Sequence, residues 1–134
     1  MPVTQLSIQP ELSPLHHYRM GEALRPLLDE NVLLLASGSL THNVQEWRGR
    51  TGDAPLPYVA DFQHWVHEAL ARQDVAALLD YRTLAPHAAR AHPTDEHWLP
   101  FYVALGAGGA ESAVQRITDE VTYGMLAMDT YVFR

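Results

Sequence analysis

The chain has 134 residues, a net charge of −7 and no cysteine. Its length predicts a single domain, residues 1–134, and an apolar content of 47% supplies enough side chains for a core. The excess of acidic over basic residues argues against nucleic acid as a partner, because nucleic-acid phosphates are bound by clustered lysine and arginine. The absence of cysteine excludes disulfides, cysteine-bound zinc, iron–sulfur clusters and thiol nucleophiles.

No targeting or membrane-spanning segment is expected. Residues 1–6 lack the basic region and the long apolar run of a signal peptide. The longest purely apolar run, residues 32–36, is far too short to cross a bilayer. Together with the lack of cysteine, these features predict a cytoplasmic protein without a membrane partner.

The first part of the chain predicts a strand, a helix and a second strand. Residues 3–8 alternate apolar and polar side chains, as a half-buried strand does. Ser13 followed by Pro14 is typical of a helix start, and the helix is expected to end near Asp29. The apolar run at 32–37 is typical of a strand that is covered on both faces in a parallel sheet.

The remainder predicts mainly helices and a closing strand. In chain order we expect a loop at 48–58, a helix at about 59–72, a short helix around 77–79, an irregular or briefly helical stretch at 81–91, a helix from about 95 to 105 and a strand at 125–133. Asp74 and Thr94 have the character of N-caps. Pro100 is expected either to bend its helix or to move the helix start later.

This order of elements predicts an α/β domain with a mostly parallel central sheet flanked by helices. Strands that are apolar on both faces need more cover than these helices provide. A partner surface is therefore expected, with a homodimer as one form of it.

Two histidines stand out by their surroundings. His42 follows the apolar run in a loop of small polar residues, among them Ser39, and Asn43 comes directly after it. Small residues permit close backbone approach to a ligand, and the Asn43 amide can fix a ring or an oxygen. Taken alone, a histidine in such a loop is more often a structural or surface residue.

His97 lies in the first turn of the helix expected from Thr94 and is followed at once by aromatic residues. A histidine at such a boundary can present a neutral nitrogen to a metal, although a solvated or capping role is the common alternative. The acidic neighbour Glu96 points about 100° away on a helix, so the pair would not easily serve one ion.

The remaining histidines are weaker candidates. His64 and His67 have the i, i+3 spacing of a metal pair, but they lie beside the apolar stripe of their helix, which favours a solvated face. His87 and His92 lie in a proline-containing loop that they can order through hydrogen bonds to the backbone.

Five segments of the sequence together resemble a known family. They are residues 3–8, residues 17–21 (His-Tyr-Arg-Met-Gly), residues 36–43 (Ala-Ser-Gly-Ser-Leu-Thr-His-Asn), residues 93–100 (Pro-Thr-Asp-Glu-His-Trp-Leu-Pro) and residues 123–128 (Tyr-Gly-Met-Leu-Ala-Met). In this order they resemble the C-terminal half of the class III extradiol ring-cleavage dioxygenases, which are related to the β subunit of protocatechuate 4,5-dioxygenase. The 4,5-DOPA dioxygenase branch is the best match.

The resemblance implies an oxidoreductase in which a non-haem Fe(II) binds a small aromatic diol and O2, and the ring opens beside the diol. Zinc is the other ion that the resemblance allows. By motif, His97 corresponds to a metal ligand. His42 corresponds to a histidine that either contacts the metal or exchanges protons with the substrate. We expect Ser39 and Asn43 to bind substrate.

Members of this family are about twice as long, and their N-terminal half supplies a His-Gly-Ser motif and a further histidine as metal ligands. Neither has a counterpart here, since no histidine precedes His16. Three readings follow. The chain is a subunit or fragment of an extradiol dioxygenase completed by a separate N-terminal half, or a non-catalytic remnant that associates with itself, or a general α/β binding domain.

Overall fold

Helices form most of the regular structure. The computed structural model describes residues 1–49 and 51–134. Its helices are α1 (Pro14–Leu24), η1 (Arg25–Glu30), η2 (Val44–Glu46), α2 (Pro57–Ala71), α3 (Val75–Leu79), α4 (Tyr81–Leu84), α5 (Ala88–Ala91) and α6 (Leu99–Gly108). Its strands are β1 (Val114–Thr118), β2 (Val121–Thr122), β3 (Leu126–Ala127) and β4 (Thr130–Phe133). In the part of the chain that is described, no helix has the length and apolar character needed to cross a membrane.

The predicted helix starts are confirmed for the first and third helices. The Ser13 hydroxyl accepts a hydrogen bond from the His16 amide at 3.2 Å, and Pro14 opens α1. The helix continues as the 3-10 helix η1 beyond Leu24, because Pro26 has no N–H to extend the α-helical ladder. Asp74 accepts from the Ala77 amide at 3.0 Å and so caps α3 as expected.

The helix expected from Thr94 starts later, as the alternative based on Pro100 predicted, and Thr94 is not its N-cap. Helix α6 begins at Leu99, and its Pro100 occupies the first turn. Proline is tolerated there because the first amides of a helix have no partner inside it. The Thr94 hydroxyl instead donates to Glu96 Oε1 at 2.9 Å. His97 therefore lies in the turn that precedes α6, not within the helix.

The mixed α/β class is confirmed, but the mostly parallel central sheet is not formed by the described residues. Strands β1 and β4 pair antiparallel, with Val114 opposite Phe133, and β2 pairs antiparallel with β3. The closing strand predicted at 125–133 is divided between β3 and β4 at Met128 and Asp129. The four strands follow one another through short connections, which favour antiparallel pairing over the crossovers that a parallel sheet needs.

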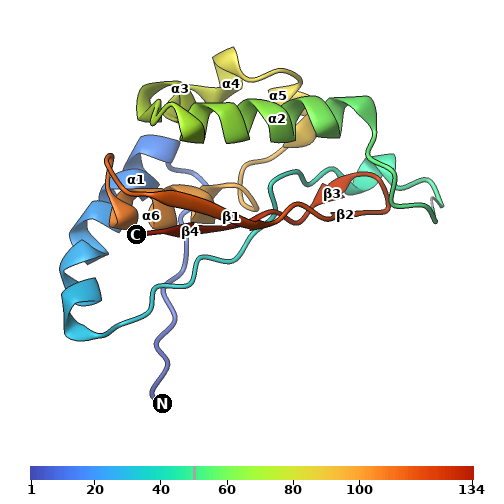
Figure 1. Ribbon diagram of the computed structural model, residues 1–134. Coiled ribbons are helices and arrows are strands. Elements are labelled where there is room, and N and C mark those ends of the chain that lie inside the picture. The colour runs from blue at the N-terminus through green and yellow to red at the C-terminus, as the bar shows by residue number, and fades with distance from the viewer. Residues whose placement is uncertain (50) are drawn as a thin grey trace.

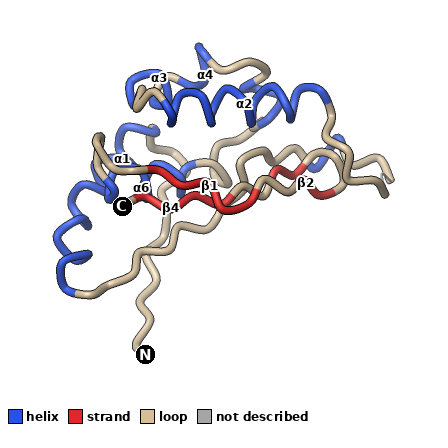
Figure 2. The backbone as a smooth tube through the Cα atoms, in the orientation of Figure 1, coloured by secondary structure: helices blue, strands red, loops and turns tan. Residues whose placement is uncertain are grey.

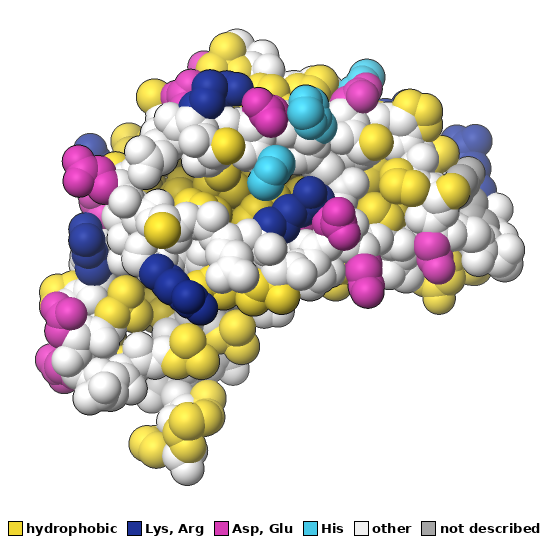
Figure 3. Space-filling model, viewed as in Figure 1, with side chains coloured by type: hydrophobic (Ala, Val, Ile, Leu, Met, Phe, Trp, Pro, Cys, Tyr) yellow, Lys and Arg dark blue, Asp and Glu magenta, His cyan; other side chains and the backbone are white. Residues whose placement is uncertain are grey.

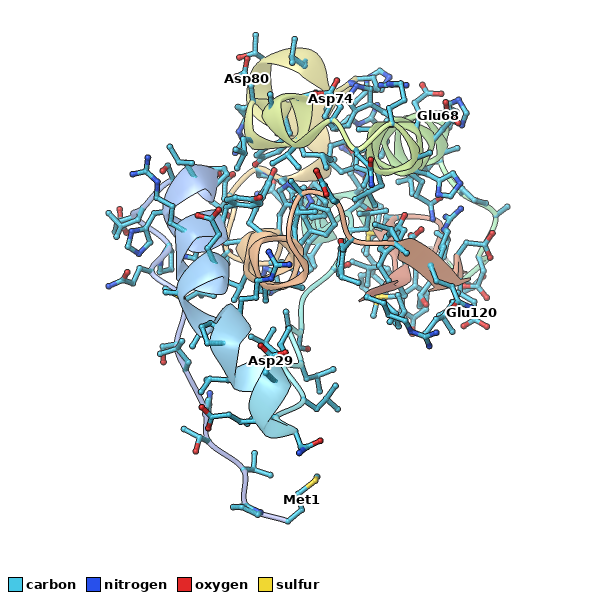
Figure 4. The ribbon with its side chains drawn as sticks, turned by 60° about the vertical axis from the view of Figure 1, so that its left-hand side comes forward. Met1, Asp29, Glu68, Asp74, Asp80 and Glu120 are labelled. Carbon is cyan, nitrogen blue, oxygen red and sulfur yellow. The ribbon has the colours of Figure 1, made fainter. Side chains whose placement is uncertain are left out.

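The strands predicted at 3–8 and 32–37 are also wrong for the chain by itself. Both segments are without regular secondary structure and run along the outside of the molecule, where Figure 2 draws them as loop. A strand is stabilised by hydrogen bonds to a neighbour, and neither segment has one among the described strands. Figure 4 places Met1 at the far end of the first segment, remote from Asp74 and Asp80.

The core lies between α2 and the layer that holds α6 and the strands (Figure 1). Its largest fully buried side chains are mainly aromatic: Trp98, Tyr58, Tyr81, Tyr102 and Phe62. Helix α1 packs against α6 through two glycines. A Cβ on Gly21 would overlap the Val103 carbonyl oxygen, and a Cβ on Gly106 would overlap that of Tyr18. This close approach fixes α6, and with it the turn that carries His97.

Candidate functional site

The structure brings His42 and His97 together from separate parts of the chain. Their imidazole rings are stacked, with centroids 3.5 Å apart and planes inclined by 13°. His42 comes from the loop at 38–43, and His97 comes from the turn before α6. Two ring systems that approach this closely form one local site, to which each side chain contributes its nitrogens.

Backbone contacts fasten the loop at 38–43 to the turn of His97. The Ser39 amide donates to the His97 carbonyl at 2.8 Å. Gly38 makes this approach possible, because a Cβ at that position would overlap the same carbonyl oxygen. The His42 amide donates to the Ala91 carbonyl at 2.8 Å, which ties the loop to the end of α5. The position of His42 relative to His97 is therefore set by main-chain bonds on both sides.

The same loop is bound to β3 on its other side. Thr41 is fully buried, and its hydroxyl donates to the Met125 carbonyl at 2.8 Å and accepts from the Ala127 amide at 2.9 Å. The Leu40 amide donates to the Ala127 carbonyl at 2.9 Å. Thr41 was not among the predicted site residues, although its place inside the motif at 36–43 is a signal that could have found it.

Ser39 and Asn43 lie in this loop, and each donates a hydrogen bond to a main-chain carbonyl. The Ser39 hydroxyl donates to the Thr41 carbonyl at 2.7 Å, and the Asn43 amide nitrogen donates to the Arg90 carbonyl at 2.7 Å. Asn43 Oδ1 is buried and accepts no hydrogen bond within the described residues. In this arrangement both side chains hold the loop in place.

His92 supports the site from the core side. It is fully buried, its ring stacks on Trp98, and its Nε2–H donates to the Leu40 carbonyl at 2.7 Å. Burial lowers the pKa of His92 to about 4, so the ring is neutral at ordinary pH. The expected hydrogen bond from His92 to the backbone is present, but its acceptor is Leu40 in the loop at 38–43 and not a residue of its own segment. His87 instead contacts the Asp61 carboxylate, at 3.2 Å. That His92 joins the two segments of the site became evident only from the fold.

The turn of His97 is anchored by its neighbours. Trp98 is buried, and its indole N–H donates to the Tyr102 hydroxyl at 2.9 Å. Tyr102 in turn donates to the Leu78 carbonyl at 2.6 Å. On the other side, the Tyr81 hydroxyl donates to Asp95 Oδ1 at 2.7 Å, and Arg82 forms an ion pair with the same carboxylate. Buried hydrogen bonds of this kind hold a functional side chain more rigidly than a free loop would.

The electrostatics favour a neutral ring at His42. Partial burial lowers the pKa of His42, the nearby His97 lowers it further, and Glu96 acts in the opposite direction. The pKa of Glu96 is lowered, first by the hydrogen bond from Thr94, so its carboxylate is charged. Glu96 Oε1 lies 3.6 Å from His97 Nδ1, a buried atom without a hydrogen bond within the described residues. A carboxylate in this position suits a histidine whose other nitrogen binds a ligand.

The donor chemistry suits a transition metal, but the number of donors does not complete a site. Imidazole nitrogens are common ligands of iron and zinc. Within residues 1–49 and 51–134, no group of three or more histidine, aspartate or glutamate side chains is placed to hold a metal ion. Catalytic sites usually have three protein ligands. His42 and His97 therefore fit part of a metal site.

The other histidines lie apart from this pair. His64 and His67 lie on α2, outside its buried face, as expected for a solvated face. His17 is buried, its Nδ1–H donates to the Ser13 carbonyl at 2.9 Å, and its Nε2 accepts from the Gln9 amide at 3.1 Å. His17 thus joins the N-terminal segment to α1.

Known proteins resemble this chain in sequence and in fold. The chain is 38% identical over 133 residues to a 4,5-DOPA dioxygenase extradiol of Beta vulgaris, covering 99% of this chain and 49% of the relative. It is 28% identical to a 4,5-DOPA dioxygenase extradiol of Escherichia coli K12, covering 96% and 48%. The crystal structure of an uncharacterized Escherichia coli K12 protein superposes with a TM-score of 0.83 at 26% identity, covering 94% of this chain and 53% of that one.

The chain thus spans about half the length of the curated relatives it matches. The model of the family described as the catalytic LigB subunit of aromatic ring-opening dioxygenase matches residues 1–134. The resemblance inferred from the motifs at 36–43 and 93–100 is confirmed. This protein belongs to the family of the catalytic LigB subunit of aromatic ring-opening dioxygenases.

Proposed function

We propose that this chain provides half of the active site of an extradiol dioxygenase that cleaves a catechol-type ring, with DOPA as the first substrate to test. The observation that carries the proposal is the stacked pair of His42 and His97. Membership of the family and the names of the Beta vulgaris and Escherichia coli relatives support the reaction type. Small aromatic diols and O2 are the proposed reactants.

His42 and His97 are the residues of this chain that would hold a non-haem Fe(II), or zinc in its place. When bound, the metal would supply open positions at which a diol and O2 can meet. Further ligands would come from the half of the family fold that this chain does not match. That half is carried by a separate polypeptide or by another part of the same one.

The residues of the chain have separate proposed roles around the diol. Where His42 does not itself bind the metal, its neutral imidazole would accept a proton from a substrate hydroxyl and return it later. Ser39 and Asn43, whose hydrogen bonds to main-chain carbonyls hold the loop at 38–43, would bind the substrate beside His42. Glu96 would orient His97 by accepting from its Nδ1–H.

A ring-cleavage assay tests this function. The chain is combined anaerobically with Fe(II), DOPA and the half of the Beta vulgaris relative that it does not match, and O2 is then admitted. The yellow ring-opened product is expected in the parent and is expected to fall at least 100-fold in His42→Ala and in His97→Ala. His64→Ala, which removes a histidine from α2 that lies apart from the pair, is the matched control and should retain the parent rate.

A non-catalytic remnant is the second candidate, favoured by the lack of a group of three metal-ligating side chains in the described part of the chain. Such a remnant would persist as a self-associating domain, and light scattering would give the mass of a homodimer. Absence of ring-opened product from a complex of the chain with the complementary half would reject the dioxygenase proposal and leave this one.

A further inference from the structure

Two segments of the chain lack regular secondary structure, and nothing in the described structure pairs with their backbones. They are residues 3–8 and residues 32–37. From 33 to 37, no backbone N–H or carbonyl takes part in a hydrogen bond with another described residue, and the same holds from 3 to 8. Backbone groups of this kind are ready to pair with a strand from outside.

Both segments carry exposed apolar side chains. Val3 is 84% exposed and Leu6 is 61% exposed, while Leu33 and Leu35 are 84% and 85% exposed. Leu34 and Ala36, between and after the two leucines, are partly buried. One face of residues 32–37 therefore packs against the rest of the molecule, and the other face is exposed to solvent. Figure 3 shows hydrophobic side chains on the projecting N-terminal segment and along the neighbouring lower edge.

The family identifies what would cover these segments. The chain matches 49% of the Beta vulgaris relative and 53% of the structural neighbour, so about half of each is a region to which this chain has no counterpart. Residues 32–37 lead straight into the loop of His42. A polypeptide seated along them would lie beside His42 and His97, where further metal ligands are needed.

We propose that residues 3–8 and 32–37 are docking strands, and that they pair through their backbones with the polypeptide that carries the other half of the family fold. The proposal rests on the proposed function for the identity of the occupant. Strand addition of this kind draws its affinity from main-chain hydrogen bonds and from alternate side chains that enter the partner. A second copy of this chain suits the surface less well, because it would join two molecules that each carry a net charge of −7.

Sedimentation and hydrogen exchange test the docking strands. The probe is the half of the Beta vulgaris 4,5-DOPA dioxygenase that this chain does not match, purified as a separate polypeptide. We expect a one-to-one complex. In the chain alone, the amides of 33–37 should exchange as fast as those of an unstructured peptide, and the complex should slow them at least 100-fold.

Two double variants test whether binding depends on residues 32–37 or on surface charge in general. Leu33→Lys with Leu35→Lys should weaken the complex at least tenfold, while the unfolding of the chain itself stays unchanged because both side chains are exposed. Leu84→Lys with Ile117→Lys, at positions 52% and 60% exposed on α4 and β1, is the matched control and should bind as the parent does. No complex, a complex that leaves residues 33–37 unprotected, or a homodimer that persists with the probe present would overturn the proposal.

Combined with hydrogen exchange, the ring-cleavage assay distinguishes a failure of the docking strands from a failure of the proposed function. Slowed exchange at 33–37 without ring-opened product would support the docking strands and reject the dioxygenase activity. His97→Ala leaves both segments intact and should form the same complex as the parent in the absence of metal. Product formed by a complex in which these amides still exchange freely would reject the docking strands alone.

Discussion

Asp129 is a buried carboxylate whose charge is balanced by one neighbour. Its side chain is fully buried, and Arg116 Nε donates to Oδ1 at 2.7 Å while Gln63 Nε2 donates to Oδ2 at 2.8 Å. This network joins β1 and α2 to the turn between β3 and β4. Because a carboxylate away from water needs a partner charge, Arg116 stabilises the segment that also holds Thr41.

Replacing Arg116 tests that balance. Arg116→Met keeps much of the length of the side chain and leaves the Asp129 carboxylate buried without a partner charge. We expect the free energy of unfolding to fall by about 3 kcal/mol, measured by urea denaturation at pH 7.

The control removes an ion pair at the surface. Arg72 lies 3.7 Å from Glu68, and both side chains are about half exposed. Arg72→Met should change the free energy of unfolding by no more than about 0.5 kcal/mol. A loss in Arg116→Met as small as that of the control would contradict the role given to the buried pair.

At the scale of elements, the packing of α1 on α6 determines where His97 lies. Gly21 and Gly106 face the backbone of the opposite helix, and neither position has room for a Cβ. Side chains can rotate away from a clash, but a backbone carbonyl cannot, so the two helices would have to separate. The aromatic residues that follow His97 hold α6 on its other side.

Gly106→Ala therefore sets two effects against each other. Alanine favours a helix over glycine by about 1 kcal/mol, whereas overlap with the Tyr18 carbonyl oxygen opposes it. We expect the overlap to dominate and the free energy of unfolding to fall by about 2 kcal/mol or more. Gly52→Ala, where an added Cβ would meet no other atom within 4 Å, should be neutral to within about 0.5 kcal/mol. A stabilised Gly106→Ala would show that α1 and α6 can part at little cost.

At the scale of the whole molecule, stability should depend on pH through His92. This ring joins the loop at 38–43 to the aromatic core, and burial lowers its pKa to about 4 from an ordinary 6.5. Above pH 6.5 the ring is neutral in both the folded and the unfolded chain, so its contribution is fully present. Between pH 6.5 and about 4 only the unfolded chain takes up the proton, and folding is weakened as the pH falls.

The corresponding measurement is the free energy of unfolding from about pH 7.5 down to about 4.5, a range that spans most of this window. His92 should contribute a slope of about 1.4 kcal/mol per pH unit below 6.5. His92→Gln keeps a donor for the Leu40 carbonyl and removes the titration, so its curve should be flatter by that amount. Equal slopes in the parent and the variant would contradict a neutral buried His92.

Much of the helical structure could be predicted from local pattern. Ser13 and Asp74 are N-caps whose bonds are formed with residues three positions away, and Pro100 restricts the start of α6 by its own chemistry. The strands were predicted less well. Residues 3–8 and 32–37 have the side chains of strands, but pairing depends on a neighbour that a sequence pattern does not name.

The family and the two histidines of the candidate site could be recognised from local motifs, because the segments at 36–43 and 93–100 are contiguous and carry their chemistry in residue type. The fold was needed to show that the two rings stack, that His92 supports them from the core, and that two segments with the character of strands stay unpaired among the described residues. The physical reason is that stacking, burial and strand pairing join residues far apart in the chain. Their energies depend on which surfaces meet and not on local preference.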